Sequence, residues 1–130
     1  MKKVSFLALA FVIALSLAIV AFAAADKEAI KKQVDEIVVA MDGGKKADDF
    51  KDAAKKEPYY VFIMEDSGNM LVHPSLTGKS LKTEAGPVYV ELVKATPAGI
   101  WVDYVWQEKQ KHTYVRKTKS GLIVGSGYSE

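Results

Sequence analysis

The spacing of hydrophobic positions changes once along the chain after residue 25, and this change separates predicted helices from predicted strands. From Asp26 to Met41 apolar residues recur every three or four positions with charged residues between them, the pattern of an amphipathic helix. Asp26 is placed to cap this helix and Gly43-Gly44 to stop it. A second, shorter helix is predicted from about Lys45 to Lys56, and Pro58 ends it.

The segment that follows has the composition of a β-hairpin. Tyr59 to Met64 is aromatic and β-branched throughout, which favours a strand buried on both faces. Asp66 to Asn69 carries a turn signal, and Met70 to His73 is a short return strand stopped by Pro74.

The second half of the chain begins with a long segment that lacks periodicity, Ser75 to Gly86, which predicts a functional or mobile loop. Pro87 to Ala95 is predicted to be helical, with Pro87 at the first helical position. Three strands are then predicted, at Ile100 to Gln107, His112 to Lys119 and Leu122 to Tyr128. Strands grouped around short helices favour an α+β fold, with an antiparallel sheet packed on the N-terminal helix.

The first 25 residues have the three parts of a signal peptide: two lysines, an apolar run and a small-residue end. Ala21-x-Ala23 and Ala23-x-Ala25 both fit the cleavage rule, so cleavage after Ala23 or after Ala25 is expected. An uncleaved membrane anchor is the alternative, because the run is long enough to span a bilayer. We therefore expect a periplasmic or secreted domain at residues 26–130.

Removal of residues 1–25 makes the domain neutral, because two of the 18 basic side chains go with it and all 16 acidic ones stay. A neutral domain does not favour a nucleic-acid partner, since phosphate binding relies on a basic patch. The chain has no cysteine, which excludes disulfides, Cys-ligated zinc and a thiol nucleophile. About 105 residues suffice for one core.

Catalytic motifs are not apparent in the sequence. Gly78-Lys79-Ser80 lacks the first glycine of a P-loop, and no Gly-x-Ser-x-Gly elbow occurs. His73 and His112 are too few for a metal site. We therefore expect neither an enzyme nor a protein with a metal or another cofactor.

Aromatic and cationic residues are instead concentrated in the strands. Taken singly, each aromatic residue is expected to fill the core; together with the loop after His73 they predict a pocket roofed by that loop. Tyr hydroxyls, a Trp indole N–H and a Lys ammonium are all hydrogen-bond donors. A site made of donors and cations selects a small anion, most simply a carboxylate.

Four motifs in order resemble the single Cache domains of bacterial sensors, over about Asp26 to Tyr128. A hydrophobic strand, an Asp-x-x-Gly turn and a His-Pro occur within Tyr60 to Pro74. The later motifs are Gly78-Lys79-Ser80-Leu81, then Tyr104-x-Trp106 with Lys111-x-x-Tyr114, and finally Gly125-Ser126-Gly127-Tyr128.

The resemblance implies a PAS-like antiparallel sheet of five strands packed on a long N-terminal helix. It also implies a pocket for a small organic acid, such as acetate, propionate, lactate or pyruvate. The residues that match positions facing or supporting that pocket are His73, Tyr104, Trp106, Lys111 and Tyr114. Lys111 is expected to supply the charge, the two tyrosines and His73 hydrogen bonds, and Trp106 an apolar wall.

Family members usually sit between two membrane helices, whereas this sequence ends after its last predicted strand. We therefore expect a stand-alone binder that signals through a partner, a membrane receptor or a histidine kinase. The alternative is a structural or interaction protein of the same fold with a collapsed pocket, which docks on a receptor by its helix or sheet edge. The N-terminal helix is also a candidate for pairing with a copy of itself in a homodimer.

Overall fold

The computed structural model describes residues 25–130. All of the predicted signal peptide except Ala25 lies outside these residues, so its cleavage stays a prediction. No helix within residues 25–130 has both the length and the apolar character needed to cross a membrane. In chain order the elements are α2 (Lys27–Asp42), the 3-10 helix η1 (Ala47–Lys55), β1 (Val61–Met64), β2 (Met70–Val72), α3 (Leu81–Glu84), α4 (Gly86–Leu92), β3 (Ile100–Trp106), β4 (Lys109–Lys117) and β5 (Ile123–Ser129).

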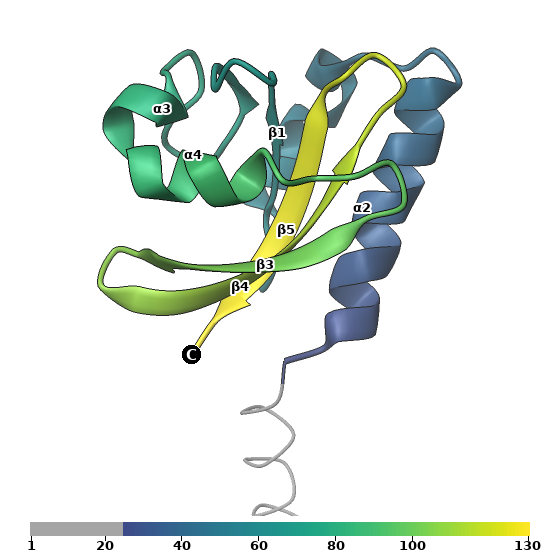
Figure 1. Ribbon diagram of the computed structural model, residues 1–130. Helices are drawn as coiled ribbons and strands as arrows, with labels where there is room; N and C mark the ends of the chain where they lie inside the picture. The colour runs from purple at the N-terminus through teal and green to yellow at the C-terminus, as the bar shows by residue number, and fades with distance from the viewer. Residues whose placement is uncertain (1–24) are drawn as a thin grey trace, which may run out of the picture.

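The five strands form one antiparallel sheet in the order β2-β1-β5-β4-β3, with β5 at its centre. Figure 1 shows α2 along one side of this sheet and α3 and α4 on the other. The arrangement confirms the predicted α+β fold, a PAS-like five-stranded antiparallel sheet packed on a long N-terminal helix.

Each face of the sheet has its own apolar core, because side chains along a strand alternate between the two faces. On one face α2 and η1 pack over the strands, and Tyr114 and Val124 belong to this cluster. On the other face α3 and α4 pack over Phe62 and Val115. The two neighbouring residues Tyr114 and Val115 therefore face opposite cores.

Helix α2 begins where the sequence predicts, at its cap Asp26, whose carboxylate accepts a hydrogen bond from the Ala29 backbone N–H at 3.0 Å. Its apolar stripe is buried against the sheet, from Ile30 to Val38. That stripe is not free to pair with a second copy. A homodimer through this helix has to use the outer face, where Val39 is 65% exposed.

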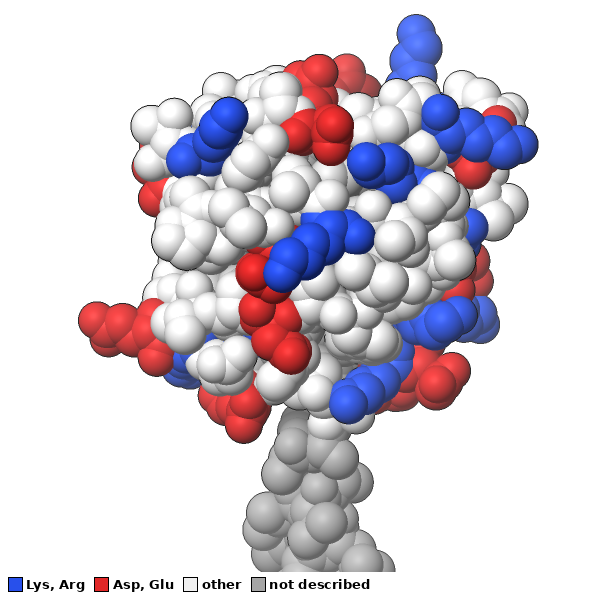
Figure 2. Space-filling model, viewed as in Figure 1, with Lys and Arg blue, Asp and Glu red and all other residues white. Residues whose placement is uncertain are grey.

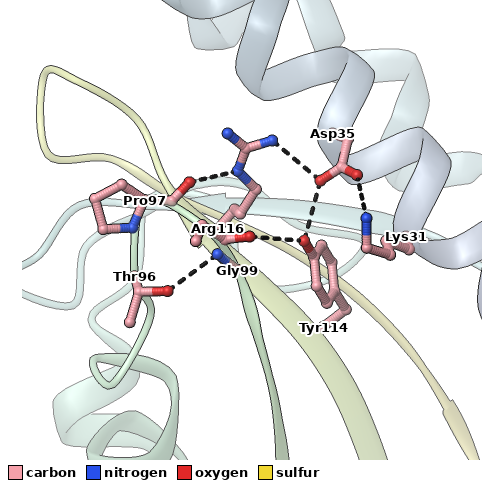
Figure 3. A network of polar contacts seen from close by, with 8 residues as sticks. Lys31, Asp35, Thr96, Pro97, Gly99, Tyr114 and Arg116 are labelled. Atoms are coloured by element: carbon pink, nitrogen blue, oxygen red, sulfur yellow. Dashed lines mark hydrogen bonds and ion pairs between the residues drawn. The ribbon is translucent and has the colours of Figure 1, made fainter.

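A polar network joins α2 to the sheet (Figure 3). One carboxylate oxygen of Asp35 accepts hydrogen bonds from Arg116 and from the Tyr114 hydroxyl, each at 3.1 Å, and the other accepts one from Lys31 at 2.9 Å. Burial alone would raise the pKa of Asp35, but these three donors lower it below its ordinary value. The network holds the middle of α2 on β4.

The structure departs from several predicted boundaries: β1 starts at Val61 and not Tyr59, and α4 ends at Leu92 and not Ala95. The predicted loop contains the one-turn helix α3, which starts at the buried Leu81. Strand β4 starts at Lys109, three residues before the predicted His112, because Gln107 and Glu108 form a two-residue turn with φ of 49° and 67°. Turns with both central residues at positive φ match the twist of a hairpin.

The charges of the domain are mixed. Figure 2 shows basic and acidic side chains interspersed on the face in view. This face has no continuous basic patch of the kind that binds phosphate. The mixture agrees with the neutral total calculated for residues 26–130.

Candidate functional site

A pocket lies between the sheet and the α3–α4 segment, on the face away from α2. It is lined by aromatic and aliphatic side chains: Tyr60, Phe62, Met70, His73, Leu81, Val88, Leu92, Tyr104 and Trp106. The volume open to the centre of a water-sized molecule is about 20 Å³, which is room for about one water. This pocket has the mostly apolar lining and few polar groups typical of small-ligand sites.

Lys111 is not itself a lining residue, but its buried ammonium contacts one of them, Tyr60. Lys111 is 5% exposed, and its ammonium donates a hydrogen bond of 2.7 Å to the hydroxyl of Tyr60. Among residues 25–130 no carboxylate forms an ion pair with it. Burial lowers the pKa of Lys111 from 10.5 to about 8, because the charged form is poorly solvated there.

The Tyr60 ring gives Lys111 part of the solvation that burial removes. The ammonium lies 4.3 Å from the centroid of that ring, within the range of a cation–π interaction. Burial also raises the pKa of the Tyr60 hydroxyl, so the hydroxyl stays protonated and offers its own hydrogen to a further acceptor.

His73 faces the same pocket from the end of β2. Its Nδ1 accepts hydrogen bonds from the backbone N–H groups of Ser75 and Leu76, both at 3.0 Å, so the neutral ring carries its hydrogen on Nε2. Burial, and then the positive charge of Lys111, lower the pKa of His73 to about 4. The histidine is therefore a neutral hydrogen-bond donor at pH 7.

The pocket places Tyr104 and Trp106 next to this histidine. The Trp106 ring centroid lies 6.2 Å from that of His73. The Tyr104 hydroxyl is hydrogen-bonded to Thr113 at 2.8 Å, and burial raises its pKa. Tyr104 is also the cross-strand partner of Lys111 in the register of β3 and β4. Four of the five predicted site residues are thus brought together.

Tyr114, the fifth, does not join them. It lies three residues after Lys111 on the same strand, and an odd spacing on a strand places two side chains on opposite faces. Its ring packs in the core under α2, and its hydroxyl donates to Asp35. The prediction that Tyr114 supports the pocket is wrong, and its role is to fix α2.

Tyr60 is the principal residue that the sequence did not assign to the site. It stands directly before β1 and meets Lys111 although 51 positions separate them. The only signal in the sequence is its place in the aromatic run before Val61. Within residues 25–130 no group of three or more His, Asp and Glu side chains is arranged to hold a metal ion.

Comparison with known proteins identifies a similar fold but does not identify a family. No model of a known protein family matches the chain, and no curated protein matches its sequence. Among solved structures, a methyl-accepting chemotaxis protein from Vibrio parahaemolyticus RIMD 2210633 is similar, with a TM-score of 0.55 and 18% sequence identity. The similarity covers 79% of this chain and 87% of that chain. At this identity it establishes a shared fold.

Proposed function

We propose that the domain binds a small organic acid in this pocket, and that a partner reads the bound state as a signal. The ligand is a short carboxylate such as acetate, propionate, lactate or pyruvate. The observation that carries the proposal is the buried ammonium of Lys111, which has a tyrosine as its partner and no carboxylate. A charge in such a place is stabilised when an anion arrives.

The other polar groups of the pocket select the same kind of ligand. The Nε2–H of His73, the free hydrogen of the Tyr60 hydroxyl and the indole N–H of Trp106 are all donors. A carboxylate has two oxygens and only accepts, so it satisfies Lys111 at one oxygen and a second donor at the other.

Binding rather than catalysis is proposed, because the one imidazole in the pocket is a weak base. With both backbone hydrogen bonds at Nδ1 and a pKa of about 4, His73 does not accept a proton near neutral pH.

The size of the pocket limits the ligand to a few atoms. The cavity has room for about one water, so a bound acid must displace part of the surrounding side chains. Of the Ser75–Gly86 segment only Leu81 lines the pocket, and α4 adds Val88 and Leu92, so the α3–α4 segment forms the roof and is the part we expect to yield. Opening of the roof is then the change that binding produces.

The similarity in fold to a methyl-accepting chemotaxis protein supports a role in sensing. Together with the four sequence motifs it supports membership of the single Cache domains. We propose that the domain acts outside the cytoplasm after its signal segment is removed, and passes its state to a membrane receptor or a histidine kinase.

The test is a thermal-shift and calorimetric screen of residues 26–130 against short mono-carboxylates. Lys111→Met should weaken binding by about 1.5–3 kcal/mol, the range for a hydrogen bond to a charged group. The matched control is Lys109→Met, which removes an exposed lysine from the same strand and should leave affinity unchanged. Affinity should also fall as the pH rises above about 8, where Lys111 loses its proton.

The second candidate function is that of an interaction protein with a collapsed pocket, and the small cavity volume favours it. The two differ in one result. If no carboxylate stabilises the protein and Lys111→Met leaves every measured affinity unchanged, the acid-binding proposal is wrong and the interaction role stands.

A further inference from the structure

Strand β3 is an outer strand of the sheet and pairs only with β4. The two strands are joined by the two-residue turn, so Trp106 and Lys109 form a hydrogen-bonded pair, and bonded and non-bonded pairs alternate from there. The N–H and C=O groups of Trp101, Asp103 and Val105 therefore point away from β4. In Figure 1 β3 lies at the front of the sheet, with no described element beyond it.

The other edge of the sheet is closed by the chain itself. On β2 the N–H of Met70 donates to the C=O of Lys79 at 2.9 Å, and the C=O of Met70 accepts from the N–H of Gly78 at 2.8 Å. For the outward groups of β3, residues 25–130 provide no such partner. One edge is covered and the other is open.

The open edge also carries exposed apolar side chains. Trp101 is 37% and Val105 62% exposed, and both lie on the α2-side face of β3 with Asp103 between them. Natural edge strands are usually protected by charged side chains, above all lysine, by proline, by a bulge or by very short length. Strand β3 has seven residues, no lysine, no proline and no bulge. Its sole charged side chain is the Asp103 carboxylate, 64% exposed.

The charge at the centre of this edge is held in place. His112 bridges two carboxylates, with Nδ1 2.5 Å from Asp103 and Nε2 2.6 Å from Glu130. Two carboxylates and one imidazole leave a net negative charge even when His112 is protonated. The Lys27 ammonium lies over the rings of Trp101 and Tyr128, at 5.8 Å from each centroid. The edge thus presents an apolar, an acidic and an apolar position in turn.

We propose that β3 is a docking edge for an extended, antiparallel strand of a partner protein with the pattern apolar-x-basic-x-apolar. In such a pair the partner residues directly opposite Trp101, Asp103 and Val105 lie on the same face as these three, and opposite charges stabilise the central pair. A second copy of β3 fits less well. The register that sets Trp101 opposite Val105 also sets the two Asp103 carboxylates opposite each other, which is destabilising. The proposal is independent of any ligand in the pocket.

The probe is the end-capped peptide TVTKTVT, with TVTETVT as its charge-reversed control. Binding is followed by NMR, through the hydrogen exchange of the outward amides of Trp101, Asp103 and Val105 in the domain. The lysine peptide at millimolar concentration should slow exchange at all three amides. The glutamate peptide should bind about fivefold or more weakly, because it places like charges opposite each other.

Two variants separate main-chain pairing from simple apolar contact. Val105→Pro removes an N–H that β4 does not use and should abolish peptide binding, whereas Val105→Thr keeps that N–H and should retain binding. Should Val105→Pro fail to fold by circular dichroism, a lysine peptide methylated at the lysine backbone nitrogen serves the same purpose, and it should not bind.

Three results overturn the proposal. The first is unchanged exchange at the three amides with the lysine peptide. The second is equal affinity for the two peptides, which excludes charge selection by Asp103. The third is a dimer in sedimentation equilibrium whose amides are protected without peptide, which makes a second copy the occupant of the edge.

Discussion

The substitution Lys111→Met is predicted to make the unliganded domain more stable while weakening its affinity for acids. Each pKa unit corresponds to about 1.4 kcal/mol. Lowering the pKa of Lys111 from 10.5 to about 8 therefore costs the folded state about 3 kcal/mol at pH 7. Methionine fills the same space without a charge, and the Tyr60 hydroxyl loses one donor. We expect a gain of about 1–3 kcal/mol in the free energy of unfolding.

The stability difference between Lys111→Met and the wild type is predicted to depend on pH. Below pH 8 both the folded and the unfolded state hold the Lys111 proton, so the cost is fully present. Between pH 8 and 10.5 the unfolded state binds more protons, so the wild type gains stability as the pH rises and the variant does not. The advantage of Lys111→Met should fall to about half by pH 9.5.

Urea unfolding at pH 7 and pH 9.5 measures both effects, and the exposed-lysine variant Lys109→Met should differ from the wild type by no more than about 0.5 kcal/mol. Two outcomes refute the reasoning. A Lys111→Met protein that is less stable than the wild type at pH 7 would mean that the ammonium is well solvated. An advantage that does not change with pH would mean that it arises from packing alone.

Three further predictions concern the parts that surround the pocket. Since the pKa of His73 is lowered to about 4, the wild type should lose stability as the pH falls from 6.5 towards 4. His73→Asn keeps an acceptor for the following turn and should not show this loss in urea unfolding. Asp35→Asn weakens the tie to Arg116 and should lower the free energy of unfolding by about 1–2 kcal/mol at pH 7, with a smaller loss near pH 3; an equal loss at both would contradict the lowered pKa. Gly125→Ala places a methyl group against the ring of Phe62 and should lower the thermal midpoint, at a cost of about 1–3 kcal/mol; an unchanged midpoint would show that the ring moves freely.

Sequence patterns predict the fold of this domain well because both of its periodicities are strong. The three- to four-residue spacing after Asp26 identifies α2, and the apolar run before Asp66 identifies a strand buried on both faces, as β1 is. The turn at Gln107-Glu108 was beyond such patterns. Asn-Gly and Asp-Gly are the strong signals for a turn with two positive φ values, and Gln-Glu is neither.

The candidate site could be predicted only in part, for two different reasons. The error over Tyr114 was avoidable, since its odd distance from Lys111 on one strand already separates the two faces. The contact between Lys111 and Tyr60 was not avoidable, because it depends on the order of strands in the sheet, which brings β1 and β4 to either side of β5. Strand order is a property of the whole chain and leaves no local mark on either residue.

The energetics of the pocket argue for a ligand more strongly than its shape does. In an interaction protein with a closed pocket a buried ammonium costs stability, and we expect an apolar residue at position 111 to make such a domain more stable. Under the proposed function, the cost of that charge, which the Tyr60 ring offsets in part, is offset further when an anion binds, and binding then stabilises the folded domain. A cavity with room for about one water fits this proposal, in which the Lys111 ammonium moves from the Tyr60 ring to a bound carboxylate.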